Sequence, residues 1–467
     1  MPVLSSLCLM ADMVRDRAIS PVELLQSHLK QIEAQNPRLN AFVTVFAEEA
    51  HTAAKCAETA VIRGGPLGLL HGVPVTVKDC FDIAGRPTLC GSRFRLGHRA
   101  ERDAAAVARL RAAGAIILGK TNTPEFLSTY ETDNFVTGRS NNPWNLERTP
   151  GGSSGGEAAA IASFCSAGGI GSDGGGSMRI PAHFCGIVGL KPTPGRISAA
   201  GHFPVLNHPA GLMGVAGPLA RSAEDVRLLF AALSGYDSQD PFSAPVPLQA
   251  PDLSGLRVGV VEQFYQVPVH PEIRQTVRQA AKALWQIMIP AEPFEPSGLE
   301  RAPNLWWFFF GQLPALLTRQ LIQGREADAH WTSTESLASA LQAPAPSVEQ
   351  LLLNLAARDR MRAALLRQME EYPVLLMPPC GVTAFPHRSR RWNLGGDEEI
   401  GLFQAMMPAT PFNLLGLPAV VVPFGMSSDG LPIGVQLVGR PYEEEVILEV
   451  AVRLEKARGP FPHPPGL

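Results

Sequence analysis

The sequence has few cysteines, and their spacing excludes both a disulfide framework and a zinc site. Seven cysteines, an odd number, are scattered over 467 residues, and no two of them stand in a C-x-x-C spacing. The eleven histidines likewise form no H-E-x-x-H motif and no cluster at metal-ligand spacing. We therefore expect free thiols in a reducing cytoplasm, and neither a metal ion nor another cofactor.

The chain also lacks an excess of either charge and any long hydrophobic run. Its 40 basic residues stand against 43 acidic ones, a net charge of -3 at pH 7, so no nucleic-acid surface is indicated. The longest apolar stretch, residues 305–317, is too short to span a bilayer and contains Gly311, Gln312 and Pro314. The first residues lack the basic region of a signal peptide. We expect a cytoplasmic protein without nucleic acid or membrane-spanning partners.

Strand and helix signals alternate along the chain. Apolar or β-branched runs predict strands at 40–46, 73–77, 115–118, 256–261, 374–377, 419–423 and 434–438. Ser20, Pro21 and Glu23 predict the start of a helix through an N-cap, a first-turn proline and a capping box. Such alternation is typical of layered α/β folds. Because large α/β enzymes often form one continuous sheet, we expect a single domain over residues 1–467.

Glycine, unlike cysteine, is abundant, and it frames two serines. Ser153 lies in GGSSGGE and Ser177 in SDGGGSMR, 24 positions further on. We expect Ser153 on a loop at 139–156 and a second glycine-rich loop at 168–176, directly before Ser177.

These serines and an upstream lysine predict acyl-transfer chemistry. A serine hydroxyl needs an adjacent base at neutral pH, and glycine lets backbone N–H groups approach an oxyanion without a Cβ in the way. Lys78 follows the apolar run 73–77, where burial would lower its pKa and allow its neutral amine to act as the base. The pattern indicates a serine nucleophile that is activated without histidine.

Three other glycine motifs match known expressions but lack the structural context that each one needs. Residues 114–121 satisfy the phosphate-loop expression, yet their middle residues form a predicted strand. Residues 169–174 match G-x-G-x-x-G without a convincing strand before them, and 151–155 match G-x-S-x-G after a loop. We expect neither a nucleotide site nor an α/β-hydrolase elbow.

Three segments together resemble the amidase signature family: GVPVTVKD at 72–79, PGGSSGGEAAA at 150–160 and GSDGGGSMRIPAHFCGIVGLKPTPGRIS at 171–198. The resemblance continues at NLLGLPAVVVPFG and DGLPIGVQLVGRPYEEE and covers most of the chain except about 240–400. It implies a large mixed, mostly parallel twisted sheet covered by helices on both faces. It also implies a signature core at 72–198 and a variable substrate-pocket region at 240–400.

The family uses a Ser–cis-Ser–Lys triad, and each member of the triad has a counterpart in this chain. The resemblance implies that Ser177 is the nucleophile and that Lys78 is the general base. Ser153 is then the bridging serine, on a cis peptide bond after Gly152.

The same resemblance implies an oxyanion hole made by the backbone N–H groups of Gly174, Gly175, Gly176 and Ser177. Relatives usually carry Thr or Ile where this chain has Gly174, a departure that leaves the N–H donors in place.

Other polar residues of these motifs are expected to support the site rather than to touch the substrate. Asp173 and Arg179 are expected to brace the serine loop, and His183 to be a hydrogen-bonded structural histidine. Asn122 and Thr132 are expected to lie behind the site.

The resemblance assigns part of the acyl pocket to Leu127, Ser128 and Thr129 and the rest to the variable region. That region contains five consecutive aromatic residues at 306–310. Large aromatic side chains more often pack in a core than line a binding wall. Any that do face the pocket would favour bulky or aromatic amides, anilides or carbamates.

The favoured function is a stand-alone amidase that hydrolyses small apolar or aromatic amides and anilides through an acyl-enzyme. A carbamate hydrolase with the same triad is the alternative. The role of a glutamyl-tRNA amidotransferase component is less favoured, because the S-L-D-Q-type segment of the A-type subunit is replaced here by AGLMGVA at 210–216. A non-catalytic binding role would need a broken triad. The expected partner is a small-molecule amide or carbamate, and a homodimer is an open alternative to a monomer.

Overall fold

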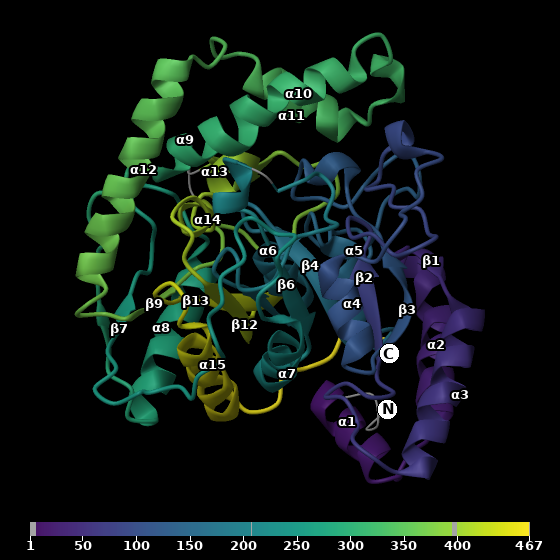
Figure 1. Ribbon diagram of the computed structural model, residues 1–467. Coiled ribbons are helices and arrows are strands. Elements are labelled where there is room, and N and C mark those ends of the chain that lie inside the picture. The colour runs from purple at the N-terminus through teal and green to yellow at the C-terminus, as the bar shows by residue number, and fades with distance from the viewer. Residues whose placement is uncertain (1–5, 207, 395–398, 467) are drawn as a thin grey trace.

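The computed structural model describes residues 6–206, 208–394 and 399–466. A mixed sheet of eleven strands lies at its centre (Figure 1). The strands are β1 (Phe42–Val45), β2 (Pro74–Lys78), β3 (Ile116–Thr121), β4 (Gly168–Asp173), β5 (Val188–Lys191), β6 (Val215–Ala220), β7 (Val258–Val260), β8 (Ala291–Pro293), β9 (Val374–Met377), β12 (Ala419–Met426) and β13 (Pro432–Val438). Their order across the sheet is β1-β3-β2-β4-β6-β5-β12-β13-β9-β7-β8. A separate hairpin is formed by β10 (Arg391–Asn393) and β11 (Glu399–Gly401).

Parallel pairing occurs in two blocks of the sheet. Strand β2 pairs in parallel with β3 and β4, and β7 pairs in parallel with β8 and β9. The strands between these blocks, and β1 at the edge, pair antiparallel with their neighbours. Parallel neighbours need crossover connections, and helices supply them, as α4 does between β2 and β3.

The helices surround this sheet. They are α1 (Leu7–Arg15), α2 (Pro21–Leu39), α3 (Ala47–Arg63), α4 (Ala105–Ala112), α5 (Gly155–Ala162), α6 (Arg179–Cys185), α7 (Ala223–Leu233), α8 (Pro271–Gln286), α9 (Ala302–Trp307), α10 (Leu313–Ile322), α11 (Trp331–Ala340), α12 (Val348–Gln368), α13 (Leu402–Met406), α14 (Thr410–Leu414) and α15 (Glu444–Arg458). A π-helical turn, Phe308–Gln312, joins α9 to α10. Short 3-10 helices lie at Arg93–Arg95, Glu125–Leu127, Ala210–Leu212 and Glu326–Asp328. In Figure 1, α9 to α12 form a green arc along the top and left of the molecule.

Strand β12 shows that both faces of the sheet are buried. Val420 and Val422 pack in one apolar cluster with residues of α7, α8 and α15. Val421, between them, packs in another cluster with Ala158 of α5 and Ala182 of α6. Successive side chains of a strand point to opposite faces, so helices must cover both sides. The predicted fold class, a large mixed α/β sheet with helices on both faces, is confirmed; the sheet was expected to be mostly parallel, and four of its ten strand pairs are parallel and six antiparallel.

The prediction of a loop over residues 168–176 is wrong for its first part. Residues 168–173 form β4, which pairs with β2 and β6 in the interior of the sheet. A Cβ at Gly169 would lie 2.1 Å from Glu157 Oε1 and 2.3 Å from the Thr76 carbonyl oxygen. Glycine is present because neighbouring elements approach closely, which is a recognised use of glycine within strands.

The helix start predicted at Ser20 is confirmed. The Ser20 hydroxyl accepts hydrogen bonds from the N–H groups of Val22 and Glu23, and the Glu23 carboxylate accepts one from the Ser20 N–H. The apolar stretch 305–317 is divided among α9, the π-helical turn and α10. Within the described ranges, no helix is both long and apolar enough to cross a membrane.

Candidate active site

Lys78 is the last residue of β2, and its side chain is 0% exposed. Its Nζ lies 2.7 Å from Ser153 Oγ and 3.0 Å from Ser172 Oγ. Burial lowers the pKa of Lys78, and nearby acidic groups, among them Asp173 and Glu157, act in the opposite sense. The net effect is a lowered pKa, which favours the neutral amine, the form that a general base requires.

Ser153 follows a cis peptide bond from Gly152, as the resemblance implies. Its hydroxyl contacts Lys78, and its carbonyl accepts a hydrogen bond of 2.9 Å from Thr123 Oγ1. A Cβ at Gly152 would lie 2.7 Å from the Thr129 carbonyl oxygen. The position before the serine therefore has no room for a side chain.

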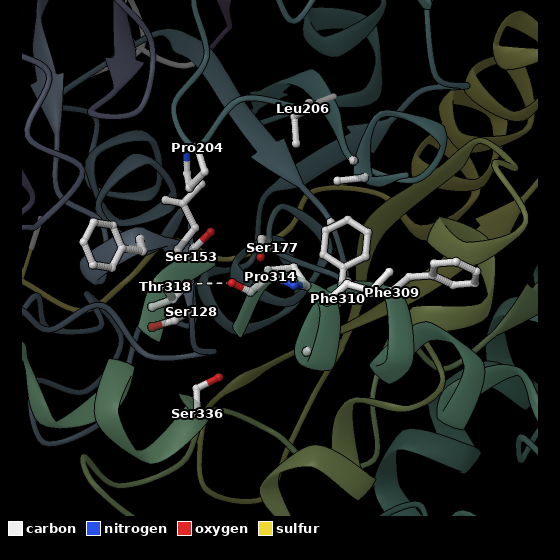
Figure 2. A pocket seen from close by; sticks show the side chains of 18 of the residues that line it. Ser128, Ser153, Ser177, Pro204, Leu206, Phe309, Phe310, Pro314, Thr318 and Ser336 are labelled. Atoms are coloured by element: carbon white, nitrogen blue, oxygen red, sulfur yellow. Dashed lines mark hydrogen bonds between the residues drawn. The ribbon is translucent and has the colours of Figure 1, made fainter. Parts of the chain in front are cut away.

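Ser177 follows three glycines after β4 and precedes α6. It is half-buried and lines the same cavity as Ser153 (Figure 2). Its carbonyl accepts a hydrogen bond of 3.0 Å from the Ser154 N–H, which ties its loop to the cis-serine segment. The structure thus brings Lys78, Ser153 and Ser177 together from three separate segments.

A buried ion pair braces the serine loop, as predicted. Arg179 donates from Nε to Asp173 Oδ2 and from Nη2 to Asp173 Oδ1, each at 3.0 Å. Burial alone would raise the pKa of Asp173, but the Arg179 guanidinium and the Gly176 N–H hold it well below its usual range. Arg179 also donates to Gln436 at 2.6 Å, which attaches the loop to β13.

The four backbone N–H groups proposed for the oxyanion hole differ in their partners. The Gly176 N–H donates to Asp173 Oδ1 at 2.7 Å. For the N–H groups of Gly174, Gly175 and Ser177, no acceptor is found among the described residues. One donor is therefore committed to the loop itself, whereas the other three have no acceptor among the described residues.

His183 is a structural residue, as predicted. Its Nδ1 accepts a hydrogen bond of 2.7 Å from the Gly434 N–H, so Nε2–H donates to the Val382 carbonyl at 3.1 Å. Burial lowers the pKa of His183 to about 4. Both ring nitrogens are occupied, which leaves none to accept a proton from the nucleophile.

Asn122 and Thr132 lie behind the site, as predicted. Thr132 Oγ1 donates to the Gly151 carbonyl at 2.9 Å and so holds the segment before Ser153. Asn122 Nδ2 donates to Ser140 Oγ at 3.0 Å, and its Oδ1 accepts from Asn134 at 2.8 Å.

A cavity of about 630 Å³ opens onto the two serines (Figure 2). Leu127, Ser128 and Thr129 line it. The other lining residues come from 126, 130, 153, 172–177, 202–206, 208–210, 214–215, 306–321, 333–337 and Phe403. Of the Asp, Glu, Lys and Arg side chains in the described part of the chain, Asp173 alone lines the cavity, and it is paired with Arg179.

Some residues of the aromatic run 306–310 pack in the core and some line the cavity, so both alternatives that the sequence leaves open apply. Phe308 and Phe309 are buried in an apolar cluster, which fits the packing interpretation. Trp306, Trp307, Phe309 and Phe310, hereafter the aromatic wall, line the cavity. The Gly174 position has no side chain because a Cβ there would lie 2.5 Å from the Phe310 ring.

Sequence reasoning missed two parts of this site. The cavity lining also includes Pro204, which follows a cis bond from Phe203, and Leu206 (Figure 2). No local pattern predicts that this loop reaches the serines. Ser172, which contacts Lys78, lies inside the 171–198 motif. A hydroxyl two residues before the glycines could have been recognised from the sequence as a partner for the lysine.

Comparisons with known proteins agree with this geometry. A family model described as Amidase matches residues 23–448. An indoleacetamide hydrolase of Bradyrhizobium diazoefficiens is 35% identical over 461 residues, covering 96% of this chain and 86% of its own length. A glutamyl-tRNA(Gln) amidotransferase A-type subunit from a Cyanothece species is 32% identical over 94% of this chain and 95% of its own.

Solved structures share the whole fold. The crystal structure of a bacterial aryl acylamidase superposes with a TM-score of 0.88 at 27% identity, covering 98% of this chain and 97% of the other. The matches extend far beyond the serine and lysine motifs. The chain belongs to the amidase signature family, whose members are hydrolases of carbon–nitrogen bonds in non-peptide amides.

Proposed function

We propose that this protein is a stand-alone amidase that hydrolyses neutral amides with apolar or aromatic substituents through an acyl-enzyme on Ser177. The observation that carries the proposal is the 2.7 Å contact between Lys78 Nζ and Ser153 Oγ beside a cavity that Ser177 lines. A buried lysine with a lowered pKa supplies the base, and both ring nitrogens of His183, the histidine in the signature motif, are already hydrogen-bonded.

The proposed proton path is built on the Lys78–Ser153 contact and on the position of Ser177 in the same cavity. The neutral Lys78 amine takes the proton of Ser153, while Ser153 takes that of Ser177 as its Oγ attacks the amide carbon. When the carbon–nitrogen bond breaks, the proton returns from Lys78 through Ser153 to the departing nitrogen. Water then attacks the acyl-enzyme along the same path and releases the carboxylic acid.

The oxyanion of the tetrahedral intermediate is assigned to the loop before the nucleophile. The N–H groups of Gly174, Gly175 and Ser177 are the donors with no acceptor among the described residues. Gly176 acts indirectly, since its N–H holds Asp173. Preorganised N–H donors of this kind contribute strongly to acyl transfer.

The cavity wall supports neutral and apolar substrates. Its volume of about 630 Å³ suits a drug-sized molecule. The aromatic wall offers rings for packing, whereas Asp173, the one Asp, Glu, Lys or Arg of the described residues on the lining, is already paired with Arg179. Glutamine has an ammonium and a carboxylate to desolvate, and among the described residues no lysine or arginine lines the cavity to pair with the carboxylate. This favours a stand-alone amidase over the amidotransferase role of other relatives.

The test is to assay the purified chain alone. Phenylacetamide, phenylacetanilide, a matched phenyl carbamate and L-glutamine would be compared by the release of ammonia or amine. We expect release from the neutral aryl amides and none from glutamine, and loss of release in Ser177→Ala. Ser163→Ala, which removes a buried hydroxyl bonded within α5, is the matched control and should stay active.

Each other outcome replaces the proposal with a different function. A higher kcat/KM for the carbamate than for the amides would identify a carbamate hydrolase with the same triad. Ammonia release from glutamine that begins only when the other amidotransferase components are added would identify a role within that complex.

A further inference from the structure

The variable region reaches the serine loop through a pair of stacked rings. Trp306 and Phe310 are four residues apart and share one helix face, with ring centroids 5.8 Å apart and planes inclined by 7°. Phe310 belongs to the π-helical turn Phe308–Gln312, a rare element often found at functional sites. Figure 2 shows Phe310 projecting into the cavity that Ser177 also lines.

Trp306 makes a directed contact with the loop, in addition to its packing. Its indole Nε1–H donates to the Gly174 carbonyl at 2.7 Å. The six-membered ring of the indole lies against Gly175, where a Cβ would be 2.3 Å from Trp306 Cζ2. Trp306 therefore makes a hydrogen bond to Gly174 and a packing contact with Gly175, the two residues before Gly176.

The next peptide plane is held by other partners. The Tyr130 hydroxyl donates to the Gly175 carbonyl at 3.0 Å, and Asp173 accepts from the Gly176 N–H. The Gly175–Gly176 plane is thus fixed at both of its ends. It cannot turn without breaking one of these hydrogen bonds.

The plane between Gly174 and Gly175 is held at one end. Trp306 binds its carbonyl, while its N–H, on Gly175, has no acceptor among the described residues. In a trans peptide the carbonyl and the N–H point in opposite directions, so fixing the first also fixes the second. Glycine on both sides allows the plane to turn freely when nothing holds it.

We propose that Trp306 is a positioning residue for the oxyanion hole: its indole N–H fixes the Gly174–Gly175 peptide plane and so aims the Gly175 N–H at the reacting carbonyl oxygen. Gly175 is a buried residue, and a buried N–H usually has a partner, which the oxyanion would provide. The inference rests on the proposed function and adds to it a residue outside the signature motifs.

The experiment replaces Trp306 with Phe, which keeps an aromatic ring and removes the N–H donor. The readout is the rate at which an alkyl fluorophosphonate labels Ser177. Ser177 Oγ bonds to phosphorus as its proton passes through Ser153 to Lys78, fluoride leaves with the electron pair of the P–F bond, and the phosphoryl oxygen occupies the oxyanion position. We expect labelling to slow about tenfold or more, and kcat for phenylacetamide to fall by a similar factor with KM unchanged.

Trp144→Phe is the matched control. Trp144 is also a half-buried indole whose Nε1 donates to a backbone carbonyl, that of Cys185, at 2.8 Å, and it does not line the cavity. Both variants lose one comparable hydrogen bond, so both should show similar decreases in Tm. Labelling should slow in Trp306→Phe alone.

The outcomes separate this inference from the proposed function. Wild-type labelling at Ser177 with an unchanged rate in folded Trp306→Phe overturns the positioning role and leaves the amidase proposal standing. Wild-type protein that is not labelled at Ser177 overturns the proposed triad itself. If Trp306→Phe does not fold, Trp306→Met, which also lacks an N–H donor at this position, takes its place, and an unchanged labelling rate in folded Trp306→Met overturns the positioning role.

Discussion

The signature core and the aromatic wall face the same cavity but are built by opposite means. In the core, Lys78, Asp173 and Arg179 are fully buried, and each has hydrogen-bond partners at about 3 Å or less. In the wall, Phe310 contributes a ring without a polar atom. The core therefore depends on the geometry of its hydrogen bonds, whereas the wall depends on how its apolar rings fill space.

This difference determines how easily each part of the site can change. Hydrogen bonds and ion pairs that are buried in the core tolerate little change, because an unsatisfied partner is costly. An apolar wall can change its shape at a smaller cost, provided that its volume is kept. Trp306 is the exception in the wall, since its N–H reaches into the core.

The largest expected effect comes from the core. Lys78→Met keeps most of the side-chain volume and removes the base, so kcat should fall by about 10⁴-fold or more. Lys191→Met is the control, because Lys191 is also fully buried but donates to the Pro192 carbonyl outside the cavity. It should keep most of its activity. More than about one hundredth of the wild-type kcat in folded Lys78→Met would contradict the role of Lys78.

The pH dependence of activity should be the next largest effect. Burial lowers the pKa of Lys78 below its ordinary value of 10.5, and the protonated amine cannot accept a proton from Ser153. The kcat/KM should therefore rise with pH, about tenfold per unit, until that pKa is passed. A profile that falls with rising pH in this range, in protein that circular dichroism shows to be folded, would rule out the lysine base.

The same shift has a consequence for stability. Between the lowered pKa of Lys78 in the folded chain and its ordinary value in the unfolded chain, unfolding takes up a proton. The free energy of unfolding should accordingly increase with pH through that window, and Lys78→Met should remove this contribution. Chemical denaturation at several pH values measures both.

A smaller effect is expected from a substitution at the contact between the core and the wall, where Gly174 lies against Phe310. Gly174→Ala places a methyl group 2.5 Å from the Phe310 ring, so the serine loop must shift, and kcat/KM for phenylacetamide should fall by about tenfold. Phe310→Ala removes the obstructing ring, so the double variant should recover activity relative to Gly174→Ala. Additive losses in the double-mutant cycle would show that the two positions do not interact.

The smallest expected effect on catalysis is that of His183→Gln. Glutamine can still donate and accept a hydrogen bond, so kcat should remain within about twofold of wild type. The free energy of unfolding should decrease by about 1–3 kcal/mol if the bonds to Gly434 and Val382 are weakened. A folded but inactive variant would return histidine to the mechanism.

The sequence by itself was sufficient to single out the residues that we propose as the reactive groups. Residues such as Ser153 and Ser177 stand in glycine-rich motifs whose order and spacing are local properties, and strands such as β2 and β12 follow from local β-branched runs. Local pattern misled at β4, where Gly168–Asp173 resembles a loop. The reason is that close packing by neighbouring elements, and not turn formation, requires glycine there.

The cavity was decided by the tertiary structure. Its wall joins residues as distant as Leu127, Leu206, Trp306 and Phe403, and no local pattern records which of these segments will meet. The hydrogen bond from Trp306 to Gly174 spans 132 positions for the same reason. Motifs encode the chemistry because it needs particular atoms, whereas the shape of the cavity arises when the sheet and its helices pack.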